Sequence, residues 1–150
     1  MINANSGEWC TEQETKRFEF KLRVYYEDTD SGGVVYYANY FKFTERGRTE
    51  MFRSFGIESQ RLATEKKIAL TVRSCEAEFK KPAKLDDLLT VSTKIRSMGG
   101  ASINLEQKLT CNDYELVKMH LKLVCISLEG RPARLPEQIR KSLKQFCNNN

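Results

Sequence analysis

Apolar and polar side chains alternate strictly near the start of the chain. Every second residue between positions 18 and 26 is apolar: Phe18, Phe20, Leu22, Val24 and Tyr26. A period of two places these side chains on one face of an extended backbone, so the stretch predicts a β-strand with one buried face. We expect the strand to end at residues 27–33, which are rich in the turn formers Asp, Ser and Gly.

The period changes to three and four residues between positions 38 and 55. Apolar or small side chains recur at that spacing: Tyr40, Phe43, Thr44, Gly47, Met51 and Phe55. The pattern predicts one long, largely buried helix, and Gly56 suits its end because glycine tolerates the left-handed conformation. A glycine inside a helix costs about 1 kcal/mol relative to alanine. We therefore interpret Gly47 as a close approach of the helix backbone to a sheet or a partner, and we expect a second, short helix at residues 59–66.

Alternation then returns in four segments of the chain: 68–79, 89–96, 101–110 and 117–125. In the first of these segments the apolar phase flips near Arg73 and Ser74, which predicts a β-bulge. Gly99 and Gly100 predict a tight hairpin turn, because glycine accepts positive φ. Apolar residues three and four apart over 135–146 predict a short C-terminal helix.

These elements predict an α+β fold in which a five-stranded antiparallel sheet packs against one long helix, because hairpin connections produce antiparallel pairing. Residues 1–15 are polar and aperiodic, and we expect them to form a flexible arm. Residues 16–147 are expected to form a single domain, since a chain of 150 residues suits one domain.

The composition excludes several classes of protein. No apolar run approaches the roughly 18 residues of a membrane-spanning helix, so none is expected. The net charge is +5, but the basic residues are spread out and mixed with acids, which disfavours a nucleic-acid partner. The five cysteines contain no C-x-x-C pair, so neither a disulfide framework nor a zinc site is expected. The first twenty residues contain no apolar segment of a signal peptide, and we expect a cytoplasmic protein.

Candidate chemistry is concentrated where the first strand meets the long helix. Asp28 and Asp30 flank Thr29, and Gly32 and Gly33 follow. Free amides at a helix start carry a partial positive charge and can polarise a carbonyl oxygen, as an oxyanion hole does. Asp30 could then attack the carbonyl carbon or activate water, which suits acyl transfer or hydrolysis. An Asx-turn at a helix entry, without chemistry, accounts for the same residues, and local physics leaves both interpretations open.

A family resemblance adds to this local evidence. The stretch Tyr26-x-Asp28-Thr29-Asp30-x-x-Gly33-Val34-Val35-Tyr36-Tyr37-x-Asn39-Tyr40 resembles the active-site signature of the 4-hydroxybenzoyl-CoA thioesterase family of hotdog-fold proteins. It is most similar to the YbgC-like acyl-CoA thioesterases, which are associated with the bacterial Tol-Pal system. Four further segments agree with that subgroup: 43–50, 82–87, 97–102 and 124–125. The resemblance covers residues 18–140 and implies a hotdog fold, with the sheet wrapped around the helix of residues 38–55.

The resemblance also assigns candidate catalytic residues. Asp30 matches the family's catalytic carboxylate, which acts as a nucleophile or as a general base. Tyr37 stands seven residues later, where most YbgC-like proteins have histidine and the 4-hydroxybenzoyl-CoA enzyme has tyrosine. A phenol of pKa about 10 mainly donates a hydrogen bond, so we expect Tyr37 to offer its backbone N–H to the thioester carbonyl. Asp28 is expected to brace the loop, and Glu45 is the second candidate acid, since other hotdog thioesterases use a glutamate on the helix.

Seven further residues are expected to bind substrate: Gly33, Val34, Val35, Tyr36, Arg73, Arg96 and Ser102. Guanidinium groups suit phosphate geometry, so Arg73 and Arg96 are the candidates for the CoA phosphates. The aromatic residues around the helix start are expected in the core rather than in an acyl pocket: Tyr36, Tyr40, Phe41 and Phe43.

The expected function is hydrolysis of an acyl-CoA thioester to free acid and CoA, without a metal or a redox cofactor. The expected partners are the acyl-CoA substrate, an acyl carrier protein as a second candidate, and further copies of the chain in a homodimer or homotetramer with active sites between protomers. The main alternative is a non-catalytic module that binds acyl-CoA or acyl carrier protein in an envelope-associated complex, which the tyrosine at position 37 favours. A hotdog dehydratase would need a catalytic histidine, and the single histidine, His120, falls on the polar phase of the last strand, where a surface role is expected.

Overall fold

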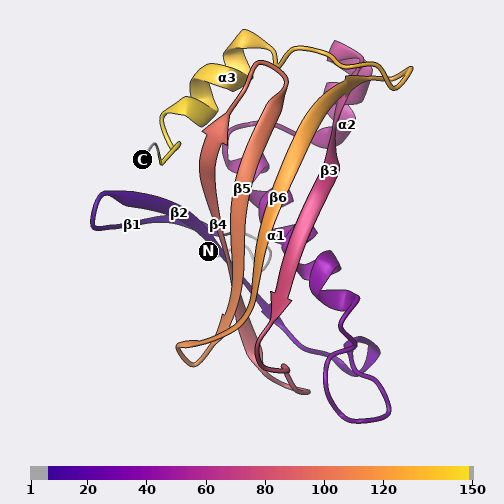
Figure 1. The fold of residues 1–150 in the computed structure, drawn as a ribbon, viewed down its shortest axis with the longest axis vertical. Helices are drawn as coiled ribbons and strands as arrows, with labels where there is room; N and C mark the ends of the chain where they lie inside the picture. The colour runs from indigo at the N-terminus through magenta and orange to yellow at the C-terminus, as the bar shows by residue number, and fades with distance from the viewer. Residues whose placement is uncertain (1–6, 149–150) are drawn as a thin grey trace.

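The computed structural model describes residues 7–148. Its elements in chain order are β1 (Glu8–Glu12), β2 (Thr15–Arg23), the 3₁₀ turn η1 (Tyr26–Asp28), α1 (Asn39–Ser54), α2 (Ser59–Arg61), the π-helical turn η2 (Leu62–Lys66), β3 (Ile68–Phe79), β4 (Leu88–Met98), β5 (Ser102–Cys111), β6 (Tyr114–Ser127) and α3 (Glu137–Lys144). Six strands form one antiparallel sheet in the order β1-β2-β4-β5-β6-β3, and the sheet curves around α1 (Figure 1). The predicted α+β class and antiparallel sheet are confirmed, whereas the predicted count of five strands is wrong.

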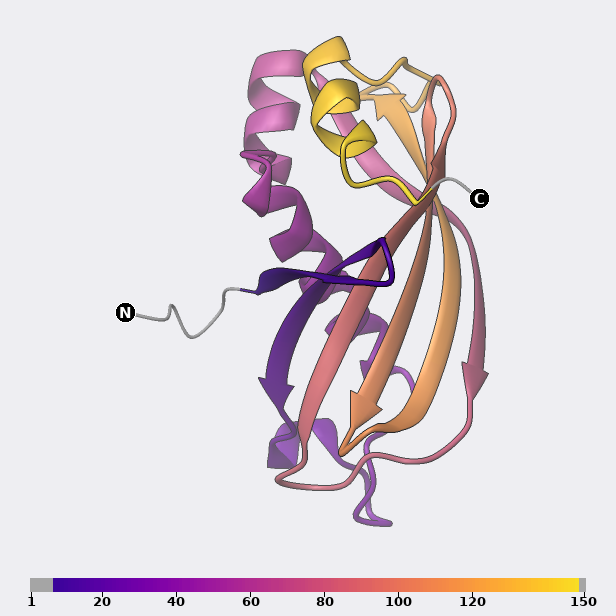
Figure 2. The ribbon, with the colours of Figure 1, turned by 90° about the vertical axis from the view of Figure 1, so that its left-hand side faces the viewer.

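The long helix packs directly on the sheet. Figure 2 shows α1, α2 and α3 on the same side of the sheet. Gly47 is buried where α1 crosses β4, and a Cβ atom added there would lie 2.5 Å from Cγ1 of Val91. No real side chain tolerates that distance, so the glycine permits the close backbone approach that the sequence predicted.

Several other local predictions are confirmed. Helix α1 ends at Ser54, and Gly56 follows with φ of +78°, the left-handed conformation expected at a helix end. The pairing of β3 with β6 shifts register between Val72 and Ser74, which is the predicted bulge. Helices α2 and η2 together cover residues 59–66, and α3 is the predicted C-terminal helix.

The turn between β4 and β5 has the predicted position but a different cause. Neither Gly99 nor Gly100 adopts a left-handed φ. Instead, the Gly99 N–H donates to the Ser102 carbonyl at 2.9 Å, and a Cβ on Gly99 would lie 2.7 Å from the Ser102 hydroxyl oxygen. Position 99 therefore suits glycine because a larger side chain would clash with Ser102, and not because the backbone adopts a left-handed conformation.

The flexible arm predicted at residues 1–15 is wrong for the part that the structure describes. Glu8–Glu12 form β1, which pairs with β2 and becomes the sixth strand. The ring of Trp9 packs against three aromatic rings, with centroid distances of 5.5 Å to Phe18, 5.3 Å to Phe55 and 4.1 Å to Phe146. A single aromatic residue in a polar stretch produces no periodic pattern, so the sequence did not indicate this strand. Residues 1–6 of the predicted arm lie outside the described residues.

One hydrophobic core runs through the described chain, from Phe18 on β2 to Leu143 on α3. Within residues 7–148, no helix has the length and apolar character needed to cross a membrane. Strand β3 is at one edge of the sheet, and its outer side pairs with no other strand of the described chain. Its apolar residues Val72 and Phe79 are 41% and 46% exposed, so this edge presents apolar surface.

Candidate active site

The loop that joins η1 to α1 lies at one end of the sheet, at the lower right of Figure 1. Its backbone forms a small antiparallel turn, in which the Asp30 N–H donates to the Val34 carbonyl at 2.9 Å and the Gly33 N–H donates to the Asp30 carbonyl at 3.0 Å. Gly33 has φ of +79°, which glycine adopts without steric cost. Hydrogen bonds therefore hold the loop in one defined shape.

Asp28 fastens this loop to the helix. Its carboxylate accepts a hydrogen bond from the Tyr25 N–H at 2.8 Å. Its carbonyl accepts hydrogen bonds from the Tyr36 N–H at 3.0 Å and from the side-chain amide of Asn39 at 2.9 Å. These contacts agree with the bracing role expected for Asp28. They also give Asn39, to which the sequence assigned no role, a structural function at the first residue of α1.

Asp30 is exposed and only partly engaged. Its Oδ1 accepts a hydrogen bond from the Gly32 N–H at 2.9 Å, which is the Asx-turn that the sequence allowed. Its Oδ2 accepts no hydrogen bond from residues 7–148. The turn and a reactive carboxylate are therefore compatible, because one oxygen holds the turn while the other is available to a ligand.

The amides at the start of α1 differ from the expectation. The N–H groups of Asn39, Tyr40 and Phe41 donate to the carbonyls of Tyr36, Tyr37 and Ala38 at 2.8, 3.2 and 3.3 Å. Bonds of the 3₁₀ type thus satisfy the first turn of the helix. The backbone N–H groups of Tyr37 and Ala38 meet no acceptor in the described part of the chain. Around the start of α1, the amides available to a carbonyl oxygen are therefore those of the two residues directly before the helix.

An aromatic groove lies beside these two amides. It has a volume of about 230 Å³ and is lined by seven residues: Val35, Tyr37, Tyr40, Phe79, Lys80, Lys81 and Pro82. Phe79, at the end of β3, contacts the rings of Tyr37, Tyr40 and Phe41 with centroid distances of 6.0, 5.9 and 6.3 Å. The sequence pattern placed Phe79 in a strand but did not indicate that it lines this groove, because its ring partners belong to a distant segment of the chain.

The four aromatic residues around the helix start divide evenly between core and surface. Tyr40 and Phe43 are buried, whereas Tyr36 and Phe41 are exposed. The Ala83 N–H donates to the Tyr40 hydroxyl oxygen at 2.9 Å. Burial raises the pKa of Tyr40 and outweighs the opposite effect of this hydrogen bond, so the phenol stays protonated and structural.

Three of the predicted substrate-binding residues lie far from the loop within one chain. Val117 on β6 pairs with Phe79 beside the loop, whereas Val124 on the same strand pairs with Ser102. Seven residues of strand separate these two points, or about 23 Å. Arg73, at the bulge of β3, and Arg96, on β4, also lie away from the loop. The structure therefore brings Asp30 together with Gly33 and Val34, keeps Val35, Tyr36 and Tyr37 in the same loop, and does not bring Arg73, Arg96 or Ser102 to it.

Arg96 already has a partner. Its Nη2 lies 2.7 Å from Oε2 of the buried Glu106, as an ion pair that lacks hydrogen-bond geometry. Burial is the largest single influence on the pKa of Glu106 and raises it, but the cations Arg96, Lys108, Lys118 and Lys94 together lower the pKa below its usual value. This ion pair competes with the predicted contact between Arg96 and a CoA phosphate.

The two remaining candidate residues lie outside the loop. His120 is exposed and pairs across the sheet with Glu106 and Glu76, so its predicted surface position is confirmed. Glu45, the second candidate acid, lies on the exposed side of α1 and accepts a hydrogen bond from the Thr49 hydroxyl at 3.0 Å.

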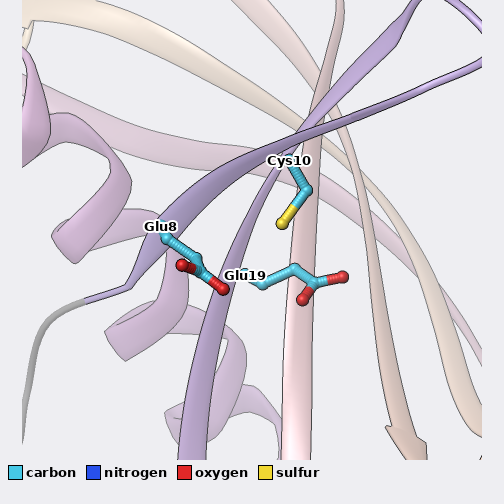
Figure 3. A group of neighbouring side chains, drawn as sticks. All are labelled: Glu8, Cys10 and Glu19. Atoms are coloured by element: carbon cyan, nitrogen blue, oxygen red, sulfur yellow. The ribbon is translucent and has the colours of Figure 1, made fainter.

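One group of possible metal ligands occurs on the hairpin of β1 and β2. Glu8, Cys10 and Glu19 place their ligand atoms within 4.8 Å of one another (Figure 3). Arg17 already donates to the Glu19 carboxylate at 2.9 Å. Burial, followed by the charges of Glu19 and Glu8, raises the pKa of the Cys10 thiol, which disfavours the thiolate that a metal needs. We assign no metal to this group.

Several known proteins are similar to this chain in sequence and in fold. The model of the thioesterase-like superfamily matches residues 24–143. The chain is 42% identical to the acyl-CoA thioesterase YbgC of Haemophilus influenzae over 124 residues, which is 82% of this chain and 91% of that protein. It is 41% identical to the acyl-CoA thioester hydrolase YbgC of Escherichia coli over 87% of this chain and 98% of that protein. A crystal structure of a probable thioesterase from Bartonella henselae is 40% identical and superimposes with a TM-score of 0.76, covering 79% of this chain and 98% of that one.

Proposed function

The chain belongs to the thioesterase-like superfamily, and within it to the YbgC acyl-CoA thioesterases, and from this premise we propose that it hydrolyses an acyl-CoA thioester to free acid and CoA. The observation that carries the proposal is the unequal engagement of the two loop acids. Asp28 is held in the hydrogen bonds of the loop, whereas Asp30 of the same loop keeps Oδ2 available, and the amides of Tyr37 and Ala38 meet no acceptor within residues 7–148. Acyl transfer requires a base or nucleophile together with amide donors for the carbonyl oxygen, and this loop offers groups of both kinds.

In the proposed reaction, the N–H groups of Tyr37 and Ala38 donate to the thioester carbonyl oxygen, which develops negative charge as the carbonyl carbon is attacked. If Asp30 is a general base, it takes a proton from water, the hydroxyl oxygen bonds to the carbonyl carbon, and the carbon–sulfur bond breaks. The departing thiolate then receives the proton that Asp30 holds. If Asp30 is the nucleophile, its oxygen bonds to the carbonyl carbon, the carbon–sulfur bond breaks, and the CoA thiolate leaves an anhydride. Water then hydrolyses the anhydride to the free acid and the Asp30 carboxylate, and the proton released protonates the thiolate. Both routes use the same free oxygen.

We propose further that two or more copies of the chain form the complete enzyme, as a homodimer or homotetramer. The outer side of β3 pairs with no described strand, and Val72 and Phe79 are exposed along it. Arg73 and Ser102 lie too far from the loop to serve the same active site within one chain. In this proposal, the residues from one copy contact CoA bound at the loop of another copy. Acyl carrier protein stays a proposed second carrier of the acyl group, and the cytoplasm stays the proposed compartment.

A thiol-release assay tests the proposed activity. The purified chain is mixed with acetyl-, hexanoyl-, palmitoyl- and benzoyl-CoA, and free thiol is measured over time. We expect release from at least one thioester, with a dependence on acyl length. Saturable binding of acyl-CoA without release from any member of the panel would instead support the non-catalytic binding module.

A further inference from the structure

Arg48, on α1, is a partly buried cation that no carboxylate of the described chain neutralises by direct contact. Its Nη1 donates to Oε1 of Gln107 at 3.4 Å, and no carboxylate of residues 7–148 lies within 4.0 Å of its guanidinium group. Burial lowers the pKa of Arg48 and outweighs the opposing effects of Glu45 and Cys75. A partly buried charge with a single long hydrogen bond has lost part of its hydration, so an anion bound beside this arginine would stabilise it.

A rigid network fixes the position of Arg48. Gln107 is fully buried, and its Nε2 donates to the Thr44 carbonyl and to the Thr93 hydroxyl, both at 2.9 Å. With its nitrogen held by two acceptors, Gln107 presents its oxygen to Arg48. Gln107 thus links the guanidinium group to Thr44, which lies one turn closer to the active-site loop than Arg48, the direction in which helical side chains tilt.

Arg48 faces a groove that has room for a ligand. The groove has a volume of about 250 Å³ and lies between α1 and the first part of β3, with Phe52, Leu62, Leu70 and Leu123 among its lining residues. The lining is mixed, since Glu45, Thr49, Ser59 and Thr71 also belong to it. The aromatic groove beside Tyr37 lies between the start of α1 and the end of the same strand, at Phe79. Both hollows therefore open on the side of α1 that faces β3.

The separation between the two sites suggests the size of the ligand. Six residues of helix separate Ala38, whose amide is proposed to bind the thioester carbonyl, from Thr44, which corresponds to about 9 Å. An acyl chain of about six carbon atoms that starts at the loop and follows α1 would end at the guanidinium group. A carboxylate at that end would neutralise the partly buried cation and could form a two-fold hydrogen-bonded pair with it.

We propose that Arg48 binds a carboxylate at the far end of the acyl group, so that the substrates of this chain are CoA thioesters of dicarboxylic acids with about six carbon atoms. The proposal rests on the proposed thioesterase function and adds the substrate class to it. Two alternative roles of Arg48 predict different results. Arg48 could stabilise the fold without binding substrate, or it could pair with a carboxylate from a second copy of the chain.

Adipoyl-CoA and hexanoyl-CoA test the proposal, because their acyl groups have the same length and differ only in the terminal carboxylate. We expect the wild-type chain to prefer adipoyl-CoA at least tenfold in kcat/KM. Arg48→Met should lower kcat/KM for adipoyl-CoA at least thirtyfold, mainly through KM, and should abolish the preference. Arg48→Lys should retain part of it, because the charge remains while the planar fork is lost. Arg46→Met is the matched control, since Arg46 is an exposed arginine of the same helix that lines the opposite side, towards β2.

Further readouts distinguish the three roles of Arg48. If Arg48→Met leaves the ratio of kcat/KM for adipoyl-CoA to kcat/KM for hexanoyl-CoA unchanged and only lowers the melting temperature, the proposal is overturned in favour of a structural role. An unchanged ratio with a smaller particle in light scattering would overturn it in favour of pairing between copies. If the wild-type chain releases thiol from neither thioester, the proposed hydrolysis fails, and the equilibrium affinities for the two intact thioesters make the same comparison. Equal affinities of the wild-type chain for adipoyl-CoA and hexanoyl-CoA would then also overturn the proposal that Arg48 binds the terminal carboxylate.

Discussion

At the scale of single residues, two aspartates of one loop are expected to have different roles, because their hydrogen bonds differ. Asp30→Asn keeps the shape and the Oδ1 acceptor of the turn but removes the charge and basicity of the free oxygen. Loss of a base or nucleophile typically costs 10² to 10⁴ in rate. We expect kcat to fall at least a hundredfold, about 3 kcal/mol of barrier, with an almost unchanged melting temperature.

Asp28→Asn is the matched variant. A neutral amide oxygen is a weaker acceptor for the Tyr25 N–H than a carboxylate, so we expect a loss of about 1 kcal/mol in unfolding free energy. Thermal unfolding and thiol release should be measured on both variants. If Asp30→Asn keeps more than a tenth of the wild-type kcat, Asp30 is not the catalytic group, and Glu45 becomes the next candidate.

The stability of the fold in acid depends on the charge of one buried residue, Glu106. Its folded-state pKa is lowered, so its charge contributes stability that is complete above the unfolded-state pKa of about 4.3 and is lost as the pH falls through the folded-state pKa. We expect Glu106→Gln to lower the unfolding free energy at pH 7 by about 1–3 kcal/mol. The variant should also lose less stability than the wild type below pH about 4.3. Urea unfolding at several pH values measures both effects, and parallel pH profiles would contradict this role.

At the scale of elements, the contact of α1 with β4 depends on the missing side chain of Gly47. Alanine has a better helix propensity by about 1 kcal/mol, but its Cβ would lie 2.5 Å from Val91 Cγ1. We expect Gly47→Ala to be destabilised by about 1–3 kcal/mol, because overpacking outweighs propensity. Combining it with Val91→Ala removes the clashing methyl, so the double variant should be more stable than the sum of the two single effects. Strict additivity in chemical denaturation would contradict the contact.

The β1–β2 hairpin depends on the docking of Trp9. Its indole N–H donates to the Ser54 hydroxyl at 3.0 Å, and its ring packs on Phe146 from the C-terminal segment. We expect Trp9→Ala to cost about 2–3 kcal/mol in unfolding free energy. Thr11→Ala, an exposed change in the same strand, should cost less than about 0.5 kcal/mol. Thiol release should change little in either variant, and equal stability losses would show that Trp9 does not anchor the strand.

At the scale of the whole molecule, the unpaired outer side of β3 favours assembly with further copies. An exposed apolar edge strand readily pairs with another chain. We expect light scattering at micromolar concentration to give a particle at least twice the 17.4 kDa of one chain. Val72→Lys should shift the particle towards the monomer and lower thiol release, whereas Leu128→Lys, at an exposed leucine outside the edge, should not. A fully active wild-type monomer would contradict an active site shared between copies.

The sequence by itself determined the elements whose pattern is local. Alternation and helical periodicity predicted β2 to β6 and α1, the phase flip at residues 72–74 predicted the bulge, and the loop motif predicted the family. These features are readable because a period of two or of 3.6 depends only on neighbouring residues.

The tertiary structure alone decided the features that depend on contacts between distant segments. Trp9 packs on Phe146 and anchors the sixth strand, the ring of Phe79 contacts the ring of Tyr37, and Gln107 holds Arg48 beside a groove between α1 and β3. It also supplied the hydrogen bonds that distinguish Asp28 from Asp30, to which the sequence assigned different roles without showing the partners of either side chain. Periodicity states which face of an element is buried, but packing decides what that face touches and which polar atoms remain free.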